Sequence, residues 1–142
     1  MINGYAQQAK DYKKQEIMTA TPGEILILLY EGAIRFLNLA KAGLQEGNPE
    51  KYHNNLLKAQ RIVVEFMTSL DMEVGGEVAQ NLYSLYEYYY FRLIQANLKK
   101  DVTMVDEVLE HLRNLKATWE QAIKIAAQEL EETEVAPKSL SA

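Results

Sequence analysis

Apolar residues recur with the 3.6-residue period of an amphipathic α-helix in four successive segments of this chain. The first predicted helix begins at Thr21, an N-cap residue followed by proline and, three positions on, by a glutamate that completes a capping box. It ends near the segment 43–47, which has a glycine at each end. Asn48, again followed by proline, repeats the start signal, and the second helix runs to about Leu70.

The third and fourth predicted helices are bounded by glycines and by an acidic cap. The adjacent Gly75 and Gly76 break the chain before the third helix, which runs to about Leu98. Asp101 is placed to cap the fourth helix, whose apolar positions repeat at spacings of mostly three and four residues up to Leu130.

These segments predict an all-α fold, an antiparallel four-helix bundle, because the connections are short and no strand pattern intervenes. We expect the bundle to span residues 21–131. Residues 1–20 form a polar N-terminal leader. Residues 132–142 are polar and contain Pro137, so we expect them to form a frayed, flexible C-terminal tail.

The first helix carries more apolar surface than one face needs. Its core-facing stripe contains Ile25, Leu29, Phe36 and Ala40. A second set, Ile27, Tyr30 and Ile34, projects roughly 140–200° away from the start of that stripe. Either the leader and neighbouring helices bury this second face, or it is a groove for a partner.

The leader is a candidate cover for that groove. Tyr5, Ala9 and Tyr12 form a short apolar stripe at helical spacing. We therefore expect the leader to shield the groove when no partner is bound, and we count Tyr5 and Tyr12 among the partner-binding residues.

Five of the nine tyrosines fall between residues 83 and 90, within the third helix. Tyr86 and Tyr89 lie on the core stripe and are expected to be core residues whose hydroxyls reach its rim. Tyr83, Tyr90 and Ile94 lie to one side of that stripe and are candidates for a partner surface, since tyrosine is enriched at interfaces.

Composition restricts the kind of partner. The formal net charge is −5, and no run of lysine or arginine forms a basic patch, so we expect no nucleic-acid binding. There is no cysteine, hence no disulfide framework or thiolate metal site. No segment approaches the length of a membrane span and the N-terminus lacks an apolar signal core, so we expect a cytoplasmic protein without membrane insertion.

Catalytic and metal sites find little support in the sequence. A di-iron bundle needs a Glu-x-x-His pair on each of two helices, and Glu50 with His53 supplies one. The residue three before His111 is Val108, so a second pair is missing. With no glycine-rich phosphate loop or nucleophile constellation either, we expect no enzyme activity, no metal and no cofactor.

Several motifs together resemble the FliS family, the flagellin-specific export chaperones of bacterial flagella. The first is TATPGE at residues 19–24, followed by LYEGA at 29–33. The second is SLDME with GGE at residues 69–77, and the third is LYEY continuing through RLI and AN at residues 85–97. Tyr12 and Trp119 also stand where the family usually has these residues, so the resemblance covers nearly the whole folded chain.

The departures from the family pattern are modest. Thr21 replaces a usual serine and keeps the capping chemistry, whereas Tyr89 and Phe91 replace a usual methionine and arginine. The resemblance implies a four-helix bundle that binds the disordered C-terminal part of flagellin, prevents its premature polymerisation in the cytoplasm and presents it to the flagellar export gate. Catalysis is not implied.

Two other classes remain as alternatives on the residues alone. A ferritin-like metalloprotein would contain metal after purification. A bundle that only oligomerises through its extra apolar face would form a stable homodimer or tetramer in light scattering.

Overall fold

The structure, a computed structural model, describes residue 8 and residues 21–140, with side chains described up to residue 134. Tyr5 and Tyr12, and with them the expected shielding by the leader, lie outside the described residues. The four described helices are α2 (Pro22–Gln45), α3 (Pro49–Ser69), α4 (Met72–Lys99) and α5 (Val102–Leu140).

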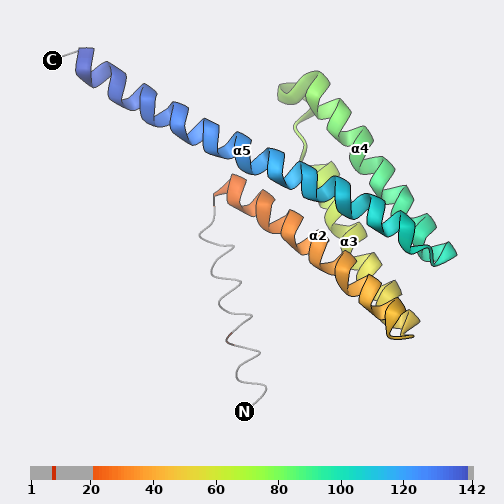
Figure 1. The fold of residues 1–142 in the computed structure, drawn as a ribbon. Helices are drawn as coiled ribbons and strands as arrows, with labels where there is room; N and C mark the ends of the chain where they lie inside the picture. Colours follow the sequence, from red (N-terminus) through yellow and green to blue (C-terminus); the bar gives the residue numbers. More distant parts are fainter. Residues whose placement is uncertain (1–7, 9–20, 141–142) are drawn as a thin grey trace.

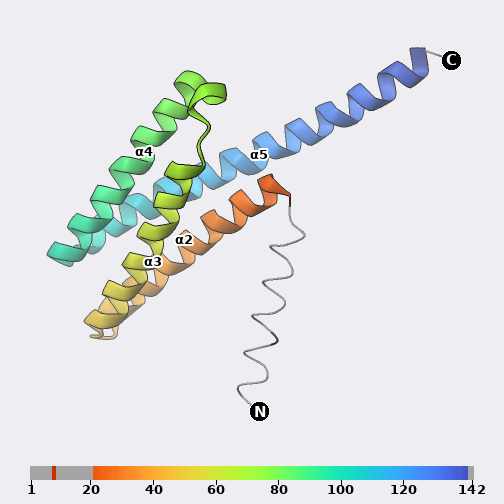
Figure 2. The same ribbon diagram turned by 180° about the vertical axis from the view of Figure 1, so that it is seen from behind.

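The helices form a bundle of two layers, with α2 beside α5 and α3 beside α4 (Figures 1 and 2). Each helix packs against the next along the chain, and contacts between α2 and α5 close the ring. Consecutive helices run in opposite directions because their connections are only a few residues long. The predicted all-α antiparallel bundle is confirmed.

Side-chain caps explain where the helices begin. The Thr21 hydroxyl accepts a hydrogen bond from the Glu24 amide at 3.2 Å, and the Asn48 side chain accepts one from the Lys51 amide at 3.0 Å. Each side chain thereby satisfies one of the amides that the first turn leaves without a partner. Both predicted start signals are confirmed.

The third helix begins earlier than predicted. Asp71 caps it by accepting hydrogen bonds from the amides of Glu73 and Val74, so α4 starts at Met72 rather than after the glycine pair. Gly76 instead introduces a kink within α4, with φ of 52° and ψ of −128°. A glycine adopts this backbone conformation without the Cβ clash that other residues meet.

The last helix continues beyond the predicted end of the bundle near Glu131, and α5 runs to Leu140 (Figure 1). The helix passes its expected end because polarity alone does not end a helix, while the extent of the bundle, residues 21–131, stays a prediction. Residues 120–134 consist mostly of strong helix formers such as alanine, glutamate, glutamine and lysine. The flexibility expected of residues 132–142 stays a prediction.

A chain of stacked aromatic rings runs through the core. The Tyr30 ring of α2 stacks on Phe66 of α3 at a centroid distance of 4.4 Å, and Phe66 stacks on Tyr86 of α4 at 5.1 Å. The Tyr30 and Tyr86 hydroxyls lie 2.6 Å apart, and Trp119 of α5 donates its indole N–H to Tyr30 at 3.1 Å. Residues from all four helices therefore meet in one layer of the core.

The core-facing side of α2 is rotated relative to the prediction. The fully buried apolar residues of this helix are Tyr30, Ala33, Leu37 and Ala40. Of the predicted core stripe, only Ala40 is fully buried, while Ile25, Leu29 and Phe36 are half-buried. The prediction that Tyr30 lies on a second, accessible face is wrong, because its ring and hydroxyl find their partners on α3, α4 and α5 inside the bundle.

Among the described residues, no helix combines the length and the apolar character that crossing a bilayer requires.

Candidate binding surfaces

A groove lies between α2 and α5 and consists of two adjoining hollows. The Ile34 basin has a volume of about 620 Å³, and the Ile27 basin one of about 470 Å³. The apolar lining of the Ile34 basin includes Ile34, Leu39 and Ala117. The apolar lining of the Ile27 basin includes Ile27, Leu28, Ile123 and Ala127. Because Glu31 and Glu120 line both hollows, we treat them as one α2–α5 groove.

A small residue and an ion-pair cluster set the geometry of this groove. A Cβ atom on Gly23 would lie only 3.1 Å from the Ile123 side chain, so glycine lets the start of α2 approach α5 closely. At the boundary between the basins, Lys116 Nζ lies 2.8 Å from a Glu120 carboxylate oxygen and 3.7 Å from one of Glu31. The hydrogen bond to Glu120 is the main reason that the pKa of Lys116 is raised.

Of the residues predicted from the first helix, the structure brings two together in the groove. Ile27 and Ile34 are half-buried and line the two basins from α2. Tyr30 lies between them in sequence but points into the core, where it has no exposed surface. The pKa of Tyr30 is raised, mainly because burial disfavours its ionised form.

The three residues predicted from the third helix lie on a different surface. Asn97 of α4 contacts His53 of α3 through side-chain nitrogens 2.8 Å apart, which marks the side of α4 that faces α3. Tyr83, Tyr90 and Ile94 precede Asn97 by 14, seven and three residues and therefore share this side. Tyr83 is 38% exposed, and the other two are half-buried. We call this surface the α4 tyrosine face.

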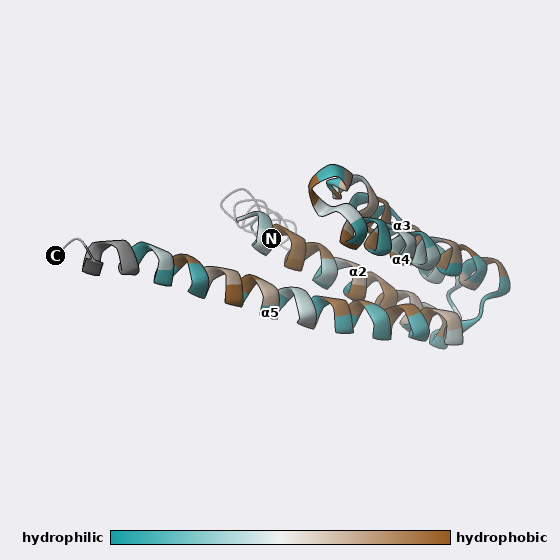
Figure 3. Cartoon of the chain, turned by 90° about the horizontal axis from the view of Figure 1, so that it is seen from above, coloured by the Kyte–Doolittle hydropathy of each residue, from teal (hydrophilic) through white to brown (hydrophobic). Residues whose placement is uncertain are grey.

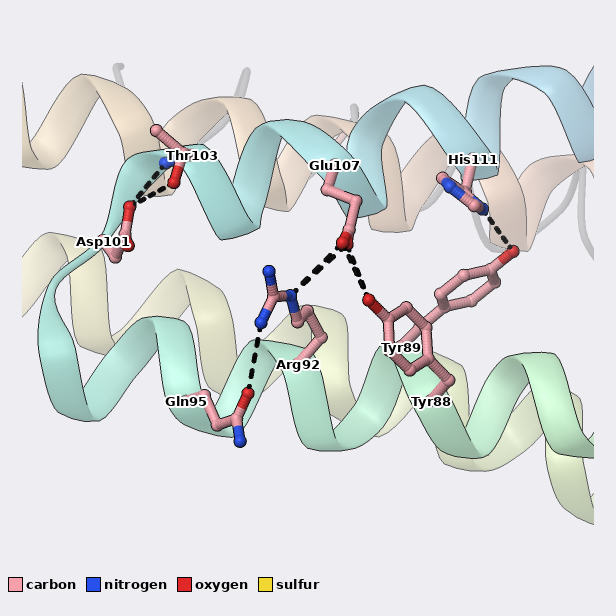
Figure 4. A network of polar contacts seen from close by, with 8 residues as sticks. All are labelled: Tyr88, Tyr89, Arg92, Gln95, Asp101, Thr103, Glu107 and His111. Atoms are coloured by element: carbon pink, nitrogen blue, oxygen red, sulfur yellow. Dashed lines mark hydrogen bonds and ion pairs between the residues drawn. The ribbon is translucent and has the colours of Figure 1, made fainter.

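The side of α4 that faces α5 is closed by polar contacts (Figure 4). The Glu107 carboxylate accepts a hydrogen bond from the Tyr88 hydroxyl at 2.8 Å and one from Arg92 Nε at 3.3 Å. The Tyr89 hydroxyl lies 3.1 Å from His111 Nδ1. The bond to Glu107 raises the pKa of Tyr88, and burial raises that of Tyr89 to about 12.

Both histidines contact neighbouring side chains rather than carboxylates. His53 is engaged by Asn97 and His111 by Tyr89, on different helix pairs. Within the part of the chain that the structure describes, no three histidine, aspartate or glutamate side chains are grouped closely enough to hold a metal ion.

The α5 wall of the groove did not emerge from the sequence. Ile123 is one of the apolar positions that repeat along the fourth predicted helix, which indicates a core residue, and the alanines at 117 and 127 carry no separate signal. The only signal in the sequence is their spacing, since Ala117, Glu120, Lys124 and Ala127 recur every three or four residues on one side of α5.

Comparisons with known proteins agree with this architecture. The family model described as flagellar protein FliS matches residues 5–126. The flagellar secretion chaperone FliS of Bacillus subtilis is 35% identical over 113 residues, which cover 80% of this chain and 84% of that protein. That of Vibrio cholerae is 38% identical over 78% of this chain and 84% of that protein. That of Salmonella typhimurium is 36% identical over 84% of this chain and 87% of that protein.

A solved structure shows the same fold. The crystal structure of a flagellar chaperone from bacteria superimposes with a TM-score of 0.69 over 84% of this chain and 97% of that one, at 21% identity. The relatives are named as chaperones rather than as enzymes. Since the family model covers most of the described bundle and relatives above 30% identity span most of the chain, this protein belongs to the FliS family of flagellar secretion chaperones.

Proposed function

We propose that this protein is a cytoplasmic export chaperone that binds the disordered C-terminal segment of flagellin. In this role it prevents premature polymerisation of flagellin and delivers it to the flagellar export apparatus, whose export gate is a further partner. The family membership supports a role in flagellar secretion. The choice of flagellin as the client, meaning the protein that the chaperone binds, is our proposal.

The observation that carries the proposal is the α2–α5 groove. Apolar side chains from both helices line it, with Ile27 and Ile34 on one wall and Ile123 on the other. Such a groove between two helices suits the apolar face of an amphipathic helix, which is a common way for a bundle to bind a peptide. A client segment that is disordered when free would fold as it enters this groove.

The energetic cost of that folding indicates a large interface. Ordering a disordered segment costs about 2–5 kcal/mol of the interaction free energy, and complexes of this kind bury about 1,000–3,000 Å². The α2–α5 groove alone is short for such an area. We therefore include the α4 tyrosine face, with Tyr83, Tyr90 and Ile94, as a second surface for the same client.

Isothermal titration calorimetry with flagellin tests the proposal. We expect one-to-one binding with a large negative heat-capacity change, and loss of binding when the C-terminal segment of flagellin is removed. Equal binding of the truncated flagellin, or none of either form, would contradict the proposal. In the absence of flagellin, light scattering that showed a stable dimer covering the groove would favour an oligomerising bundle instead.

A pair of variants locates the site on the groove. Ile27→Asp with Ile34→Asp places two charges in the apolar lining and should weaken flagellin binding strongly, while circular dichroism shows the helices intact. Ile125→Asp is the matched control, because Ile125 is 47% exposed and lies on the side of α5 away from the groove. Equal effects of the two changes would remove the groove from the proposal.

A further inference from the structure

A cluster of charged side chains divides the α2–α5 groove. Glu31 of α2 and Glu120 of α5 line both the Ile34 basin and the Ile27 basin, so they stand at the boundary between the two. Lys116 lies between these carboxylates, with Nζ 2.8 Å from Glu120 and 3.7 Å from Glu31. We call Glu31, Lys116 and Glu120 the ion divider. In Figure 3, α2 and α5 lie side by side, and hydrophilic residues interrupt the hydrophobic ones along both helices.

The two walls of the groove present the same order of side chains at the ion divider. On α2, the glutamate of the divider stands four residues after Ile27 and three before Ile34. On α5, which runs in the opposite direction, it stands three residues after Ala117 and three before Ile123. Residues three or four apart share one side of a helix. Each wall of the groove is therefore apolar, then acidic, then apolar.

The charged groups of the ion divider are accessible to water. The side chains of Glu31 and Glu120 are 52% and 50% exposed, and that of Lys116 is 26% exposed. A helix that covers the groove displaces this water. Each carboxylate has lone pairs beyond its contact with Lys116, and these then need hydrogen-bond donors from the bound helix. An apolar residue over the divider supplies none, so it leaves charged groups buried without sufficient partners.

A polar residue of the bound helix at this level avoids that penalty. An amide, hydroxyl or cationic side chain donates hydrogen bonds to the carboxylates, whereas an aspartate or glutamate adds a third negative charge. On either side of the polar residue, apolar side chains enter the two basins. Ile27 and Ile34 are seven residues apart on α2, about 10 Å along the helix. A bound helix spans the same distance with seven residues of its own.

We propose that the ion divider is a specificity-determining element, which selects client helices with a hydrogen-bond-donating residue midway between two apolar residues seven positions apart. This inference rests on the proposed chaperone function and adds a sequence rule for the client. A bound helix that shifted by one turn would place an apolar residue on the divider. The divider therefore also fixes the register of the client, as a single polar residue does in the core of a coiled coil.

A leucine scan of the C-terminal segment of flagellin tests this rule. Each polar residue of the segment that has apolar residues three or four positions away on both sides is replaced by leucine in turn. Titration calorimetry then measures the affinity of each segment for the unmodified chain. We expect the replacement that faces the divider to weaken binding about tenfold or more, because it leaves the charged groups without donors. Replacements on the solvent side of the bound helix should change the affinity little.

An apolar version of the divider supplies the paired measurement. In the variant Glu31→Leu with Lys116→Met and Glu120→Leu, the two basins join into one apolar surface. The same leucine replacement in the client should then no longer weaken binding. Glu31→Gln with Glu120→Gln is a milder variant that keeps the boundary polar, and it should recover part of the loss. Circular dichroism checks that both variants are folded.

The matched control removes the same kinds of charge away from the groove. Lys51 lies 3.0 Å from Glu46 at the corner between α2 and α3, and Glu50 precedes Lys51 in the chain. None of the three lines either basin. The variant Glu46→Leu with Glu50→Leu and Lys51→Met should discriminate against the leucine-substituted segment as strongly as the unmodified chain does.

The outcomes separate the inference from the function on which it rests. If no leucine replacement distinguishes the unmodified chain from the apolar variant, or if the control variant tolerates the same replacement, the ion divider does not select the client. A less stable apolar variant with unchanged discrimination would show that the divider only connects α2 to α5. Failure of the unmodified chain to bind flagellin would instead overturn the proposed function, and the inference with it.

Discussion

The hydroxyl oxygens of Tyr30 and Tyr86 lie 2.6 Å apart in the centre of the bundle, and the Trp119 indole donates to the first of them. The two tyrosines are 56 residues apart in sequence and belong to helices in different layers. A residue expected to contact a client thus stabilises the core from which the client surface is built.

Tyr30→Phe tests this assignment. The phenyl ring keeps its stack on Phe66, but the Tyr86 hydroxyl and the Trp119 N–H lose their partner. Leaving a buried polar group unsatisfied costs about 1–3 kcal/mol, so we expect the free energy of unfolding in urea to fall by about this amount. Flagellin affinity should be unchanged where the variant is folded. Weakened binding at unchanged stability would instead indicate that Tyr30 contacts the client.

Buried tyrosines predict a loss of stability at alkaline pH. Burial raises the pKa of Tyr52 and of Tyr89 to about 12, above the value of about 10 for an exposed tyrosine. Above pH 10 the unfolded chain therefore binds fewer protons than the folded one. The stabilisation is fully present below pH 10 and is lost as the pH rises towards 12.

Urea unfolding at a series of pH values measures this loss. The unfolding midpoint should fall steadily above pH 10, and tyrosinate absorbance of the folded protein should appear later than that of the unfolded chain. Tyr52→Phe should flatten part of the slope, at the expense of its 2.5 Å hydrogen bond to the Ala96 carbonyl. A midpoint independent of pH in this range would contradict the assignment of these phenols to the core.

The corner between α2 and α3 has no room for a side chain at Gly43. A Cβ atom there would lie 2.8 Å from the Tyr52 backbone nitrogen and 3.1 Å from the Asn48 carbonyl oxygen. Because backbone atoms yield little, Gly43→Ala should destabilise the fold by about 1–3 kcal/mol in urea unfolding. Gly32→Ala is the control, since its nearest neighbour is the flexible Ile62 side chain at 3.3 Å. Equal stabilities of the two variants would show that the corner relaxes.

The α4 tyrosine face is tested by Tyr83→Asp with Ile94→Asp. We expect weaker flagellin binding and a smaller heat-capacity change than for the unmodified chain, because less apolar surface is then buried. Val74→Asp is a suitable control, since Val74 is 86% exposed near the kink of α4. Unchanged binding parameters for the double variant would confine the client to the α2–α5 groove.

Deletion of residues 1–16 tests whether the leader shields the groove. We expect the truncated chain to bind more of a dye that fluoresces on apolar surfaces. Ile27→Asp with Ile34→Asp in the truncated chain should reverse the increase if the groove is the exposed surface. Unchanged dye binding after truncation would count against shielding.

Much of the fold followed from local chemistry in the sequence. Thr21 and Asn48 mark helix starts because their side chains satisfy amides of the first turn, whatever the tertiary structure. The start of α4 did not follow in this way, because Gly75 and Gly76 are a stronger break signal than the capping aspartate before them. In the structure, Asp71 caps the start of α4 and Gly76 lies at the kink within it.

The rotation of α2 could not be obtained from its own sequence. Six consecutive apolar residues, 25–30, place apolar side chains all around this helix. Periodicity alone therefore does not select the side of the helix that faces the core. The choice depends on Phe66, Tyr86 and Trp119, which lie far along the chain. For the same reason, the sequence did not reveal that Ile34 and Ile94 lie on different helix pairs.

The hydroxyl pair in the core also determines helix register. A purely apolar bundle tolerates one helix sliding past another by a turn. The apolar side chain one turn further along the helix then fills the same gap between the side chains of the neighbouring helix. Here such a slip would separate Tyr30 from Tyr86, Tyr52 from the Ala96 carbonyl and Tyr89 from His111, leaving buried phenols without partners. Outer apolar positions make no such contacts, so a substitution there leaves the alignment of the helices beneath it unchanged.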